Sequence, residues 1–199
     1  RDNETASIAV QSSLTGHLVF STLHTNDAAS TITRLDDLDI QPFQIASAVL
    51  GVMATRLIRT LCVHCRQPYT LTEKDLELME IDQERAKGKQ AYTAGAGCDK
   101  CHNMGYSGRA AIHELLIMDD KIRDILTKTQ DAGPIRKAAV EGGMITLRES
   151  AVSKVLEGRT SVEEAISKTQ TEELEVSEEP KQTEEEPKQT EEEPKQTEE

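Results

Sequence analysis

The 199-residue sequence lacks any run of 18 or more apolar residues, so it predicts no membrane-spanning helix. It also lacks an excess of basic charge: the formal net charge is −13, and the strongly basic surface typical of nucleic-acid-binding proteins is not expected. No secretory signal is visible at the first residue, Arg1. Because the chain does not begin with methionine, we expect it to be a fragment. The length allows one ordinary domain and something smaller.

The negative charge is concentrated at the C-terminal end. Residues 172–199 hold 13 of the 36 acidic residues and 3 of the 23 basic ones, which leaves 23 acidic and 20 basic residues elsewhere. Pro-Lys-Gln-Thr-Glu-Glu repeats every seven residues here, but the repeat has no apolar positions a and d for a coiled coil. Because this composition buries too little to offset ordering entropy, we predict a disordered tail over residues 171–199. A solubilising tail is favoured over a docking tail.

The four cysteines form two C-x-x-C pairs with 32 residues between them: Cys62, Cys65, Cys98 and Cys101. Each pair places two thiolates on one tight turn, and two facing turns complete the closed, four-thiolate arrangement of structural zinc. Structural zinc in small modules contributes on the order of 10–16 kcal/mol at neutral pH. Iron in the same thiolates, which would make an electron carrier, is the main alternative; a colourless protein with one zinc per chain would exclude it. We interpret the nearby His64 and His102 as surface residues.

A polar cluster follows an apolar run near the beginning of the chain. Residues 17–23 have the β-rich apolar composition of a buried strand, and a helix is predicted over residues 28–38. In open α/β sheets, ligands bind where a strand ends and a polar loop leads into the next helix. The residues between strand and helix therefore indicate a functional site: His24, Thr25, Asn26 and Asp27. The alternative is that Thr25 or Asn26 only caps the helix and that His24 is an ordinary half-buried histidine.

The other periodic segments favour an α/β fold. Asp2 caps a helix predicted over residues 3–14, and Pro42 opens a long helix predicted over residues 43–59. Residues 109–118 fit a strand. The cysteine region is thus predicted as an insertion between a helix and a strand, with a Thr72–Asp75 capping box inside it.

The C-terminal part is helical by pattern. Helices are predicted over residues 121–128, 134–141, 147–156 and 162–168. Thr160 with Glu163 forms a capping box for the last of these, and Ser161 is the rival cap.

Six short motifs occur in a fixed order from Arg1 to about Thr169: Arg1-Asp2-Asn3-Glu4-Thr5-Ala6, Leu14-Thr15-Gly16-His17-Leu18-Val19, Ser21-Thr22-Leu23-His24-Thr25-Asn26, Arg56-Leu57-Ile58-Arg59-Thr60-Leu61-Cys62, Gly105-Tyr106-Ser107-Gly108-Arg109, and Gly143-Met144-Ile145-Thr146-Leu147-Arg148. With these motifs the chain resembles the C-terminal half of the secretion ATPases of type II secretion and the type IV pilus assembly ATPases. The pilus retraction ATPases look similar but lack the cysteine insertion. The cysteines therefore point to the secretion and assembly branch.

The resemblance implies the C-terminal part of a RecA-like P-loop ATPase core, working as a homo-hexamer. It implies ATP and Mg²⁺ as ligands of the full-length protein, a location on the cytoplasmic face of the bacterial inner membrane, and membrane-platform proteins as partners. The expected domains are the ATPase core, a zinc-binding insertion, a helical subdomain and the tail, over residues 1–61 (continuing at 105–118), 62–104, 119–170 and 171–199.

The resemblance also implies roles for single residues. Arg1 and Asp2 end the Walker B motif, whose catalytic glutamate would precede Arg1. His17 and His24 belong to a histidine box. Because they lie seven residues and roughly 20 Å apart along a strand, both cannot contact one phosphate. We assign His24 to γ-phosphate sensing, beside Thr25, and His17 to support or a subunit contact.

Arg56 and Arg59 are candidates to supply positive charge to a nucleotide across a subunit boundary, and helix-surface salt bridges are the alternative. The sequence contains no G-x-x-x-x-G-K-[ST] loop, so these residues alone are not expected to hydrolyse ATP. The competing hypothesis is a zinc-stabilised protein-binding module without motor activity.

Overall fold

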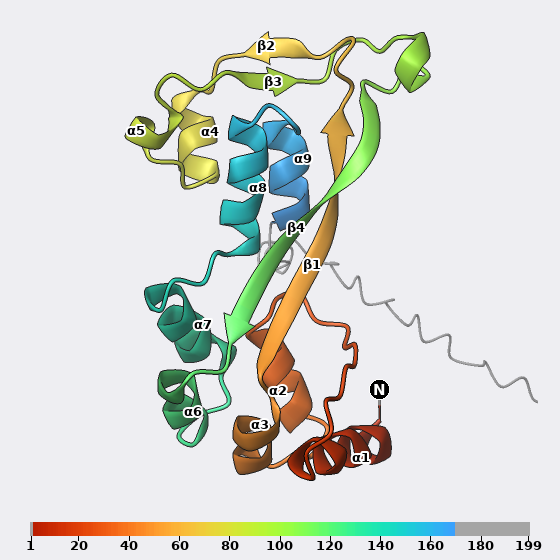
Figure 1. Cartoon of the computed structure of the whole chain (residues 1–199). Coiled ribbons are helices and arrows are strands. Elements are labelled where there is room, and N and C mark those ends of the chain that lie inside the picture. Colours follow the sequence, from red (N-terminus) through yellow and green to blue (C-terminus); the bar gives the residue numbers. More distant parts are fainter. Residues whose placement is uncertain (1, 170–199) are drawn as a thin grey trace, which may run out of the picture.

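The computed structural model describes residues 2–169 and contains two helical bodies joined by one long β-ribbon (Figure 1). Strand β1 (Gly51–Leu61) pairs antiparallel with β4 (Tyr106–Ile117). The register runs from the pair Gly51 and Ile117 to the pair Arg59 and Arg109, and it shifts before Leu61. The ribbon is therefore the frame on which both bodies are mounted.

The lower body in Figure 1 surrounds the end of the ribbon where β1 begins and β4 ends. It consists of α1 (Asn3–Leu14), α2 (Ser30–Asp36), α3 (Pro42–Ala48), α6 (Asp120–Leu126) and α7 (Ala132–Glu141). Asp2 and Asp119 cap α1 and α6 by accepting hydrogen bonds from the third residue beyond each. Apolar side chains fill its core, among them Ile32, Ile45, Leu116, Leu126 and Ile135.

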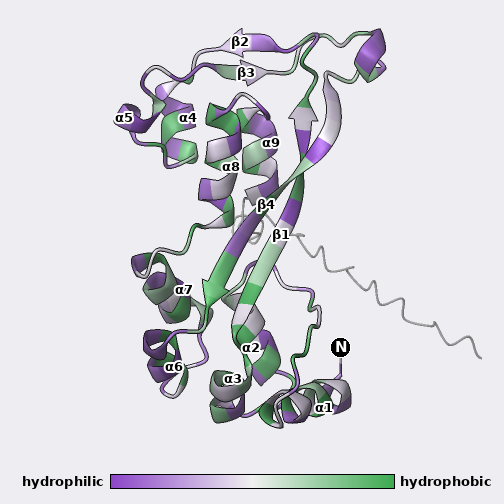
Figure 2. Ribbon diagram, in the orientation of Figure 1, coloured by the Kyte–Doolittle hydropathy of each residue, from purple (hydrophilic) through white to green (hydrophobic). Residues whose placement is uncertain are grey.

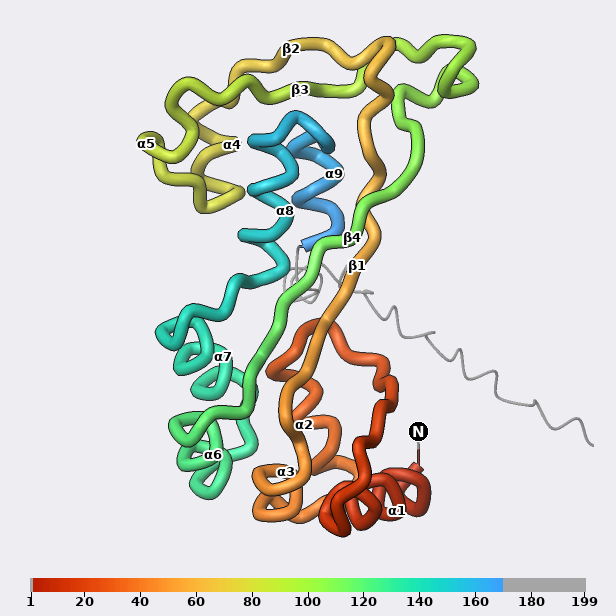
Figure 3. The backbone as a smooth tube through the Cα atoms, viewed as in Figure 1, coloured from red at the N-terminus to blue at the C-terminus, as the bar shows by residue number. Residues whose placement is uncertain are grey.

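The upper body combines the cysteine region with the last two helices. It contains β2 (Gln67–Tyr69), α4 (Glu73–Leu78), α5 (Gln83–Ala86), β3 (Ala91–Thr93), the 3₁₀ turn Asp99–Cys101, α8 (Leu147–Leu156) and α9 (Val162–Thr169). Strands β2 and β3 form a second antiparallel pair. The tube in Figure 3 shows the chain leaving β1, passing over α8 and α9, and returning through β4. A second apolar cluster holds these parts together, including Ile58, Met79, Ile112, Ala151 and Val155.

The hydropathy colouring in Figure 2 shows hydrophobic residues at the lower ends of β1 and β4. Because side chains alternate along a strand, one face of β4 is buried: Ala110, Ile112, Glu114 and Leu116. The opposite face of the ribbon is exposed. No helix within residues 2–169 is long and apolar enough to cross a membrane.

Several predicted elements are confirmed. Helices α1 and α8 have the predicted bounds, and α6, α7 and α9 lie within a few residues of theirs. The capping box of Thr72 and Asp75 opens α4. Ser161 rather than Thr160 caps α9, because its hydroxyl accepts the Glu164 N–H while the Thr160 hydroxyl donates to the Arg59 carbonyl. The helix predicted over residues 28–38 is the shorter α2.

The long helix predicted over residues 43–59 is wrong. Only α3 (Pro42–Ala48) is helical, and β1 begins at Gly51. Apolar residues three and four apart suggested a helix, but the buried and half-buried side chains alternate instead: Val52, Ala54, Arg56 and Ile58. Thr55 and Thr60 also favour a strand here, and Gly51 disfavours a helix interior. The cysteine region is therefore an insertion between two paired strands, not between a helix and a strand.

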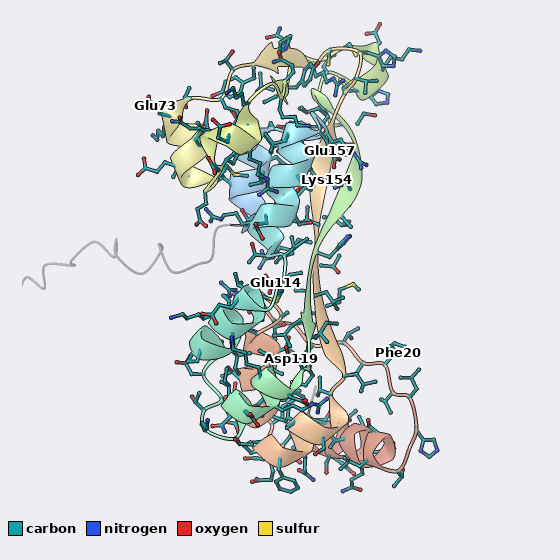
Figure 4. All side chains as sticks on the ribbon, turned by 60° about the vertical axis from the view of Figure 1, so that its left-hand side comes forward. Phe20, Glu73, Glu114, Asp119, Lys154 and Glu157 are labelled. Carbon is teal, nitrogen blue, oxygen red and sulfur yellow. The ribbon has the colours of Figure 1, made fainter. Side chains whose placement is uncertain are left out.

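The buried strand predicted over residues 17–23 is also absent from the described structure. The segment has no strand pairing, and Leu18 and Phe20 are 70% and 88% exposed. Figure 4 shows Phe20 on the outer side of the lower body. The composition gives a local preference for extended backbone, but a strand needs a neighbour, and within residues 2–169 β1 and β4 pair only with each other.

The expected helical subdomain over residues 119–170 is not confirmed. Helices α6 and α7 pack into the lower apolar cluster, whereas α8 and α9 pack into the upper one. The loop before α8 crosses between the bodies (Figure 1). The predicted tail over residues 171–199 lies outside the described residues.

Candidate functional site

The four cysteines converge on one point at the top of the ribbon. Their sulfur atoms all lie within 4.8 Å of one another. The Sγ–Sγ distances are 3.8 Å for Cys62–Cys98, Cys65–Cys101 and Cys98–Cys101. A tetrahedral ion with metal–sulfur bonds of about 2.3 Å requires sulfurs about 3.8 Å apart. The four sulfur donors and their spacing therefore fit a metal ion bound by four thiolates.

Backbone turns position these sulfurs. The carbonyl of Cys62 accepts hydrogen bonds from the N–H groups of Cys65 and Arg66, and the carbonyl of Cys98 accepts one from Cys101. Gly95 is required beside the first turn, because a Cβ there would lie 1.9 Å from the Cys65 carbonyl oxygen. The two cysteine turns are thus fixed by local geometry as well as by any bound ion.

The protein environment distinguishes the thiols electrostatically. Burial raises the pKa of Cys101, but backbone N–H groups of Cys98 and Gly105 and the neighbouring sulfurs outweigh it and lower that pKa to about 6. Burial, and then the other three sulfurs, raise the pKa of Cys65 to about 12. Cys101 is therefore more readily present than Cys65 as thiolate, the form that binds a metal.

The cysteine region is anchored on the turn between α8 and α9. Arg66 donates to the Gly158 carbonyl at 2.5 Å and lies over the Tyr92 ring, 4.1 Å from its centroid. Gly158 has φ +67°, and a Cβ there would lie 2.6 Å from the Tyr92 ring, so only glycine fits. Leu61 N–H also donates to the Arg159 carbonyl. The four-cysteine cluster and the last two helices therefore form one body.

The polar residues 24–27 lie in a loop in front of α2. His24 is exposed, and the hydroxyls of Thr25 and Thr31 lie 2.8 Å apart. Asp27 is buried, caps the turn by accepting Ser30 N–H at 2.8 Å, and forms an ion pair with Arg136 of α7. The loop is thus held from its own helix and from α7.

Arg56 belongs to this loop and Arg59 does not. Arg56 Nη2 donates to the backbone carbonyl and side-chain oxygen of Asn26 at 3.1 and 3.2 Å. Arg59 instead donates through Nε and Nη2 to the buried Glu164 carboxylate at 2.8 and 2.5 Å. Residues three apart on a strand point to opposite faces and lie roughly 10 Å apart. The structure therefore separates the two candidate arginines.

The remaining candidates lie at the two ends of α1. Arg1 is outside the described residues, and the Asp2 carboxylate accepts Thr5 N–H at 2.8 Å. His17 Nδ1 lies 3.2 Å from the Ser12 carbonyl oxygen, just beyond the other end of the helix. His17 and His24 are joined by the exposed extended segment.

Sequence reasoning missed two residues that hold the loop, Arg136 and Glu114. The Glu114 carboxylate accepts the Ala28 N–H at 2.9 Å. The signal was available for Glu114, because it is a charged residue at an alternating position between the apolar Ile112 and Leu116. The partner of Arg136 lies 109 residues away along the chain, and no local pattern reveals it.

The model of the type II/IV secretion system protein family matches residues 1–167. The chain belongs to this family. Among its curated relatives, the type IV pilus assembly ATPase PilB of Thermus thermophilus is 44% identical over 169 residues, which are 85% of this chain and 19% of that protein. The type II secretion system protein E of Dickeya dadantii is 45% identical over 172 residues, 86% of this chain and 33% of that protein. The chain thus spans about a fifth to a third of the length of these family members.

Solved structures share the fold. The pilus retraction motor PilT with bound ADP matches with a TM-score of 0.55 and 22% identity, covering 88% of this chain and 39% of that one. The ATPase DotB of Legionella pneumophila matches with a TM-score of 0.53 and 22% identity, covering 83% and 35%. The mixed α/β fold predicted from the sequence is therefore confirmed.

Proposed function

We propose that this chain is the C-terminal part of a hexameric ATPase that couples ATP hydrolysis to type II protein secretion or type IV pilus extension. Support comes from the family match over residues 1–167 and from relatives that are named as pilus assembly ATPases and secretion proteins. By the same reasoning, the protein acts at the cytoplasmic face of the bacterial inner membrane and contacts platform proteins there.

The loop over residues 24–27 is the proposed nucleotide sensor. Phosphoryl transfer depends on positioned charge and hydrogen-bond donors around the γ-phosphate. His24 is exposed and available to donate, Thr25 lies beside it, and Arg56 braces the loop through Asn26. Asp2, and Arg1 before it, would end the Walker B motif that, with Mg²⁺, orders the phosphates. His17 supports the loop or contacts a neighbouring subunit.

Arg59 is the weaker candidate to contact the nucleotide of an adjacent subunit, because Glu164 already binds part of its guanidinium group. Its side chain is 56% exposed despite the bonds to Glu164, and it also lies 4.1 Å from the centroid of the Tyr106 ring. One Nη edge of a guanidinium can pair with a carboxylate while other N–H groups face a second ligand. Arg56 is the stronger candidate because it touches the sensor loop.

The decisive experiment is His24→Ala in a longer protein that includes the residues before Arg1. Removing a donor to the developing charge lowers turnover by roughly 10²–10³-fold while folding is intact. His113→Ala is the matched control, since His113 is exposed on the outer face of β4. Unchanged turnover in His24→Ala would contradict the sensor assignment. The 199-residue chain alone is expected to hydrolyse no ATP, because it contains no phosphate-binding loop.

The four cysteines are proposed to bind structural zinc and to hold the insertion as a rigid arm for a platform or assembly partner. When bound, the ion would cross-link the two cysteine turns. Deleting residues 62–101 in the longer protein should spare nucleotide binding and abolish secretion or piliation. Normal secretion after that deletion would contradict the proposed role of the insertion as an arm for a partner.

A second candidate function is a metal-stabilised protein-binding module without motor activity. The observation in its favour is the tip of the cysteine turns, where Val63 and Met104 are 69% and 65% exposed. The His24→Ala experiment distinguishes the motor from the binding module. A motor should lose most of its ATP turnover in this variant, whereas a binding module should keep its partner binding unchanged.

A further inference from the structure

Glu114 is a buried carboxylate that contacts both halves of the molecule. Its residue is 1% exposed, and it lies on the covered face of β4, opposite Ala54 of β1. One carboxylate oxygen, Oε1, accepts the Ala28 N–H at 2.9 Å. The other, Oε2, accepts the Leu147 N–H at 3.2 Å. Figure 4 shows Glu114 at mid-height, where the upper and lower bodies meet.

The two N–H groups belong to the parts of the structure that the proposed function needs to connect. Ala28 directly follows the sensor loop over residues 24–27. Leu147 is the first residue of α8, where an N–H has no partner within the helix and a negative charge is favourable. A single carboxylate thus satisfies a donor on each side, and leaving either donor or the charge unpaired would be costly in this buried site.

The sensor loop has little freedom to move without moving Ala28. Arg56 holds Asn26 from β1, and Arg136 holds Asp27 from α7. Asp27 in turn caps the turn that contains Ala28 by accepting Ser30 N–H. A displacement of residues 24–27 therefore reaches the Ala28 N–H within one or two residues.

Helix α8 has equally direct contact with the cysteine region. Leu147, Ala151 and Val155 lie in the same apolar cluster as Met79 and Ile81 of that region. Arg148, the next residue after Leu147, donates to the Leu78 carbonyl at the end of α4. Movement at the beginning of α8 therefore displaces residues that support the metal centre.

We propose that Glu114 is a positioning residue that couples the loop over residues 24–28 to α8 and, through α8, to the cysteine region. Its carboxylate keeps the two N–H donors at a fixed separation, so a change in either body is transmitted to the other. This inference rests on the proposed function in one respect: the loop over residues 24–27 is taken to respond to nucleotide. The mechanical link itself is independent of that function.

The first experiment compares Glu114→Gln with wild type in the longer protein. An amide presents one oxygen and one NH₂ group, so it accepts one N–H and opposes the other. We measure amide hydrogen exchange over residues 147–156 and 73–86 with and without a non-hydrolysable ATP analogue. In the wild-type protein, binding of the analogue should change the exchange rates of both segments. Glu114→Gln should bind the analogue with an affinity within about threefold of wild type, but most of the change in exchange rates should be lost. Glu149→Gln removes the charge of an exposed carboxylate in the first turn of α8; it is the control and should respond like wild type.

A wild-type response preserved in Glu114→Gln would overturn the coupling. Failure of the wild-type protein to bind the analogue would instead overturn the proposed function. The two failures are thus distinguishable, and a second experiment tests the link without nucleotide.

The second experiment uses the 199-residue chain and the pair Leu147→Pro and Leu147→Ala. Proline is well tolerated at the first position of a helix, and Thr146 before it is already extended at ψ 162°, so Leu147→Pro removes the N–H with little backbone cost. Leu147→Ala removes the side chain and keeps the N–H. If Glu114 couples the bodies, exchange over residues 24–36 should be at least about tenfold faster in Leu147→Pro than in Leu147→Ala. Equal exchange in the two variants would overturn the inference even if Glu114→Gln does not fold.

Discussion

The cysteine region and the segment over residues 17–25 differ in how far their apolar side chains are buried. The cysteine region has few apolar residues of its own, yet Cys62, Met79, Ala91 and Cys101 are almost completely buried. Met79 and Ala91 share one apolar cluster with residues of the ribbon and α8. The extended segment is rich in apolar residues, yet most of them face solvent. The difference is that two cysteine turns complete each other, whereas an extended segment becomes a strand only beside another strand.

The largest expected effect comes from removing the proposed zinc ion. Removing it with a chelator, or by Cys62→Ser, should unravel residues 62–104, because structural zinc supplies on the order of 10–16 kcal/mol in small modules. Amide hydrogen exchange should rise steeply in this region and in the α8–α9 turn, which Arg66 contacts. The lower-body segments away from the Glu114 contact at Ala28 should keep their protection.

His102→Ala is the control for this prediction, since His102 is exposed and four thiolates complete the site. It should bind the same amount of zinc as wild type. Chelation that leaves exchange over residues 62–104 unchanged would contradict a structural metal.

The second prediction tests whether the two bodies are separate cores. Ile112 and Leu116 are both fully buried on the same face of β4, one in each apolar cluster. Replacing either residue with alanine should lower the free energy of unfolding by about 2–5 kcal/mol. Ile112→Ala should accelerate exchange mainly over residues 147–156, and Leu116→Ala mainly over residues 30–36. If both variants accelerate the same segments equally, the molecule is a single cooperative unit.

The third prediction concerns the ion pair that fixes α9 to β1. Glu164 is buried and accepts hydrogen bonds from the Arg59 side chain and its backbone N–H. Glu164→Gln should lower the free energy of unfolding by about 1–3 kcal/mol, less than a fully buried pair because Arg59 is half exposed. Glu157→Gln removes a half-exposed carboxylate that pairs with Lys154, and it should change the free energy of unfolding by less than about 0.5 kcal/mol.

The effect of Glu164→Gln should also depend on pH. Burial raises the pKa of Glu164, but the bonds from Arg59 outweigh it and hold that pKa below the ordinary value of 4.5. A carboxyl group with a lowered pKa stabilises the fold fully above its ordinary value and loses that contribution as pH falls through the lowered one. Denaturation curves of wild type and Glu164→Gln should therefore converge below about pH 4.5. A difference that grows on acidification would contradict this assignment.

The same contrast explains which features the sequence could predict. The cysteine cluster, the Asp2 and Thr72 caps and the bounds of α8 follow from spacings of a few residues, and these predictions are confirmed. The strand β1 was mistaken for a helix because three-four spacing and alternation overlap in an apolar stretch; its pairing with β4 bridges more than 40 residues. Arg136 and Glu114 reach partners 109 and 86 residues away, so their roles required the fold.

The smallest expected effect tests the exposed segment itself. Phe20 is 88% exposed, so Phe20→Ser should change the free energy of unfolding of this chain by less than about 0.5 kcal/mol, measured by chemical denaturation. Phe43→Ser, at an exposed position of α3, is the matched control in this chain. If residues 17–23 pair with a strand in the longer protein of the proposed function, the same substitution should lower the free energy of unfolding several-fold more there. A large cost in the 199-residue chain would mean that the segment already packs against a partner, and an equally small cost in both proteins would mean that it never becomes a strand.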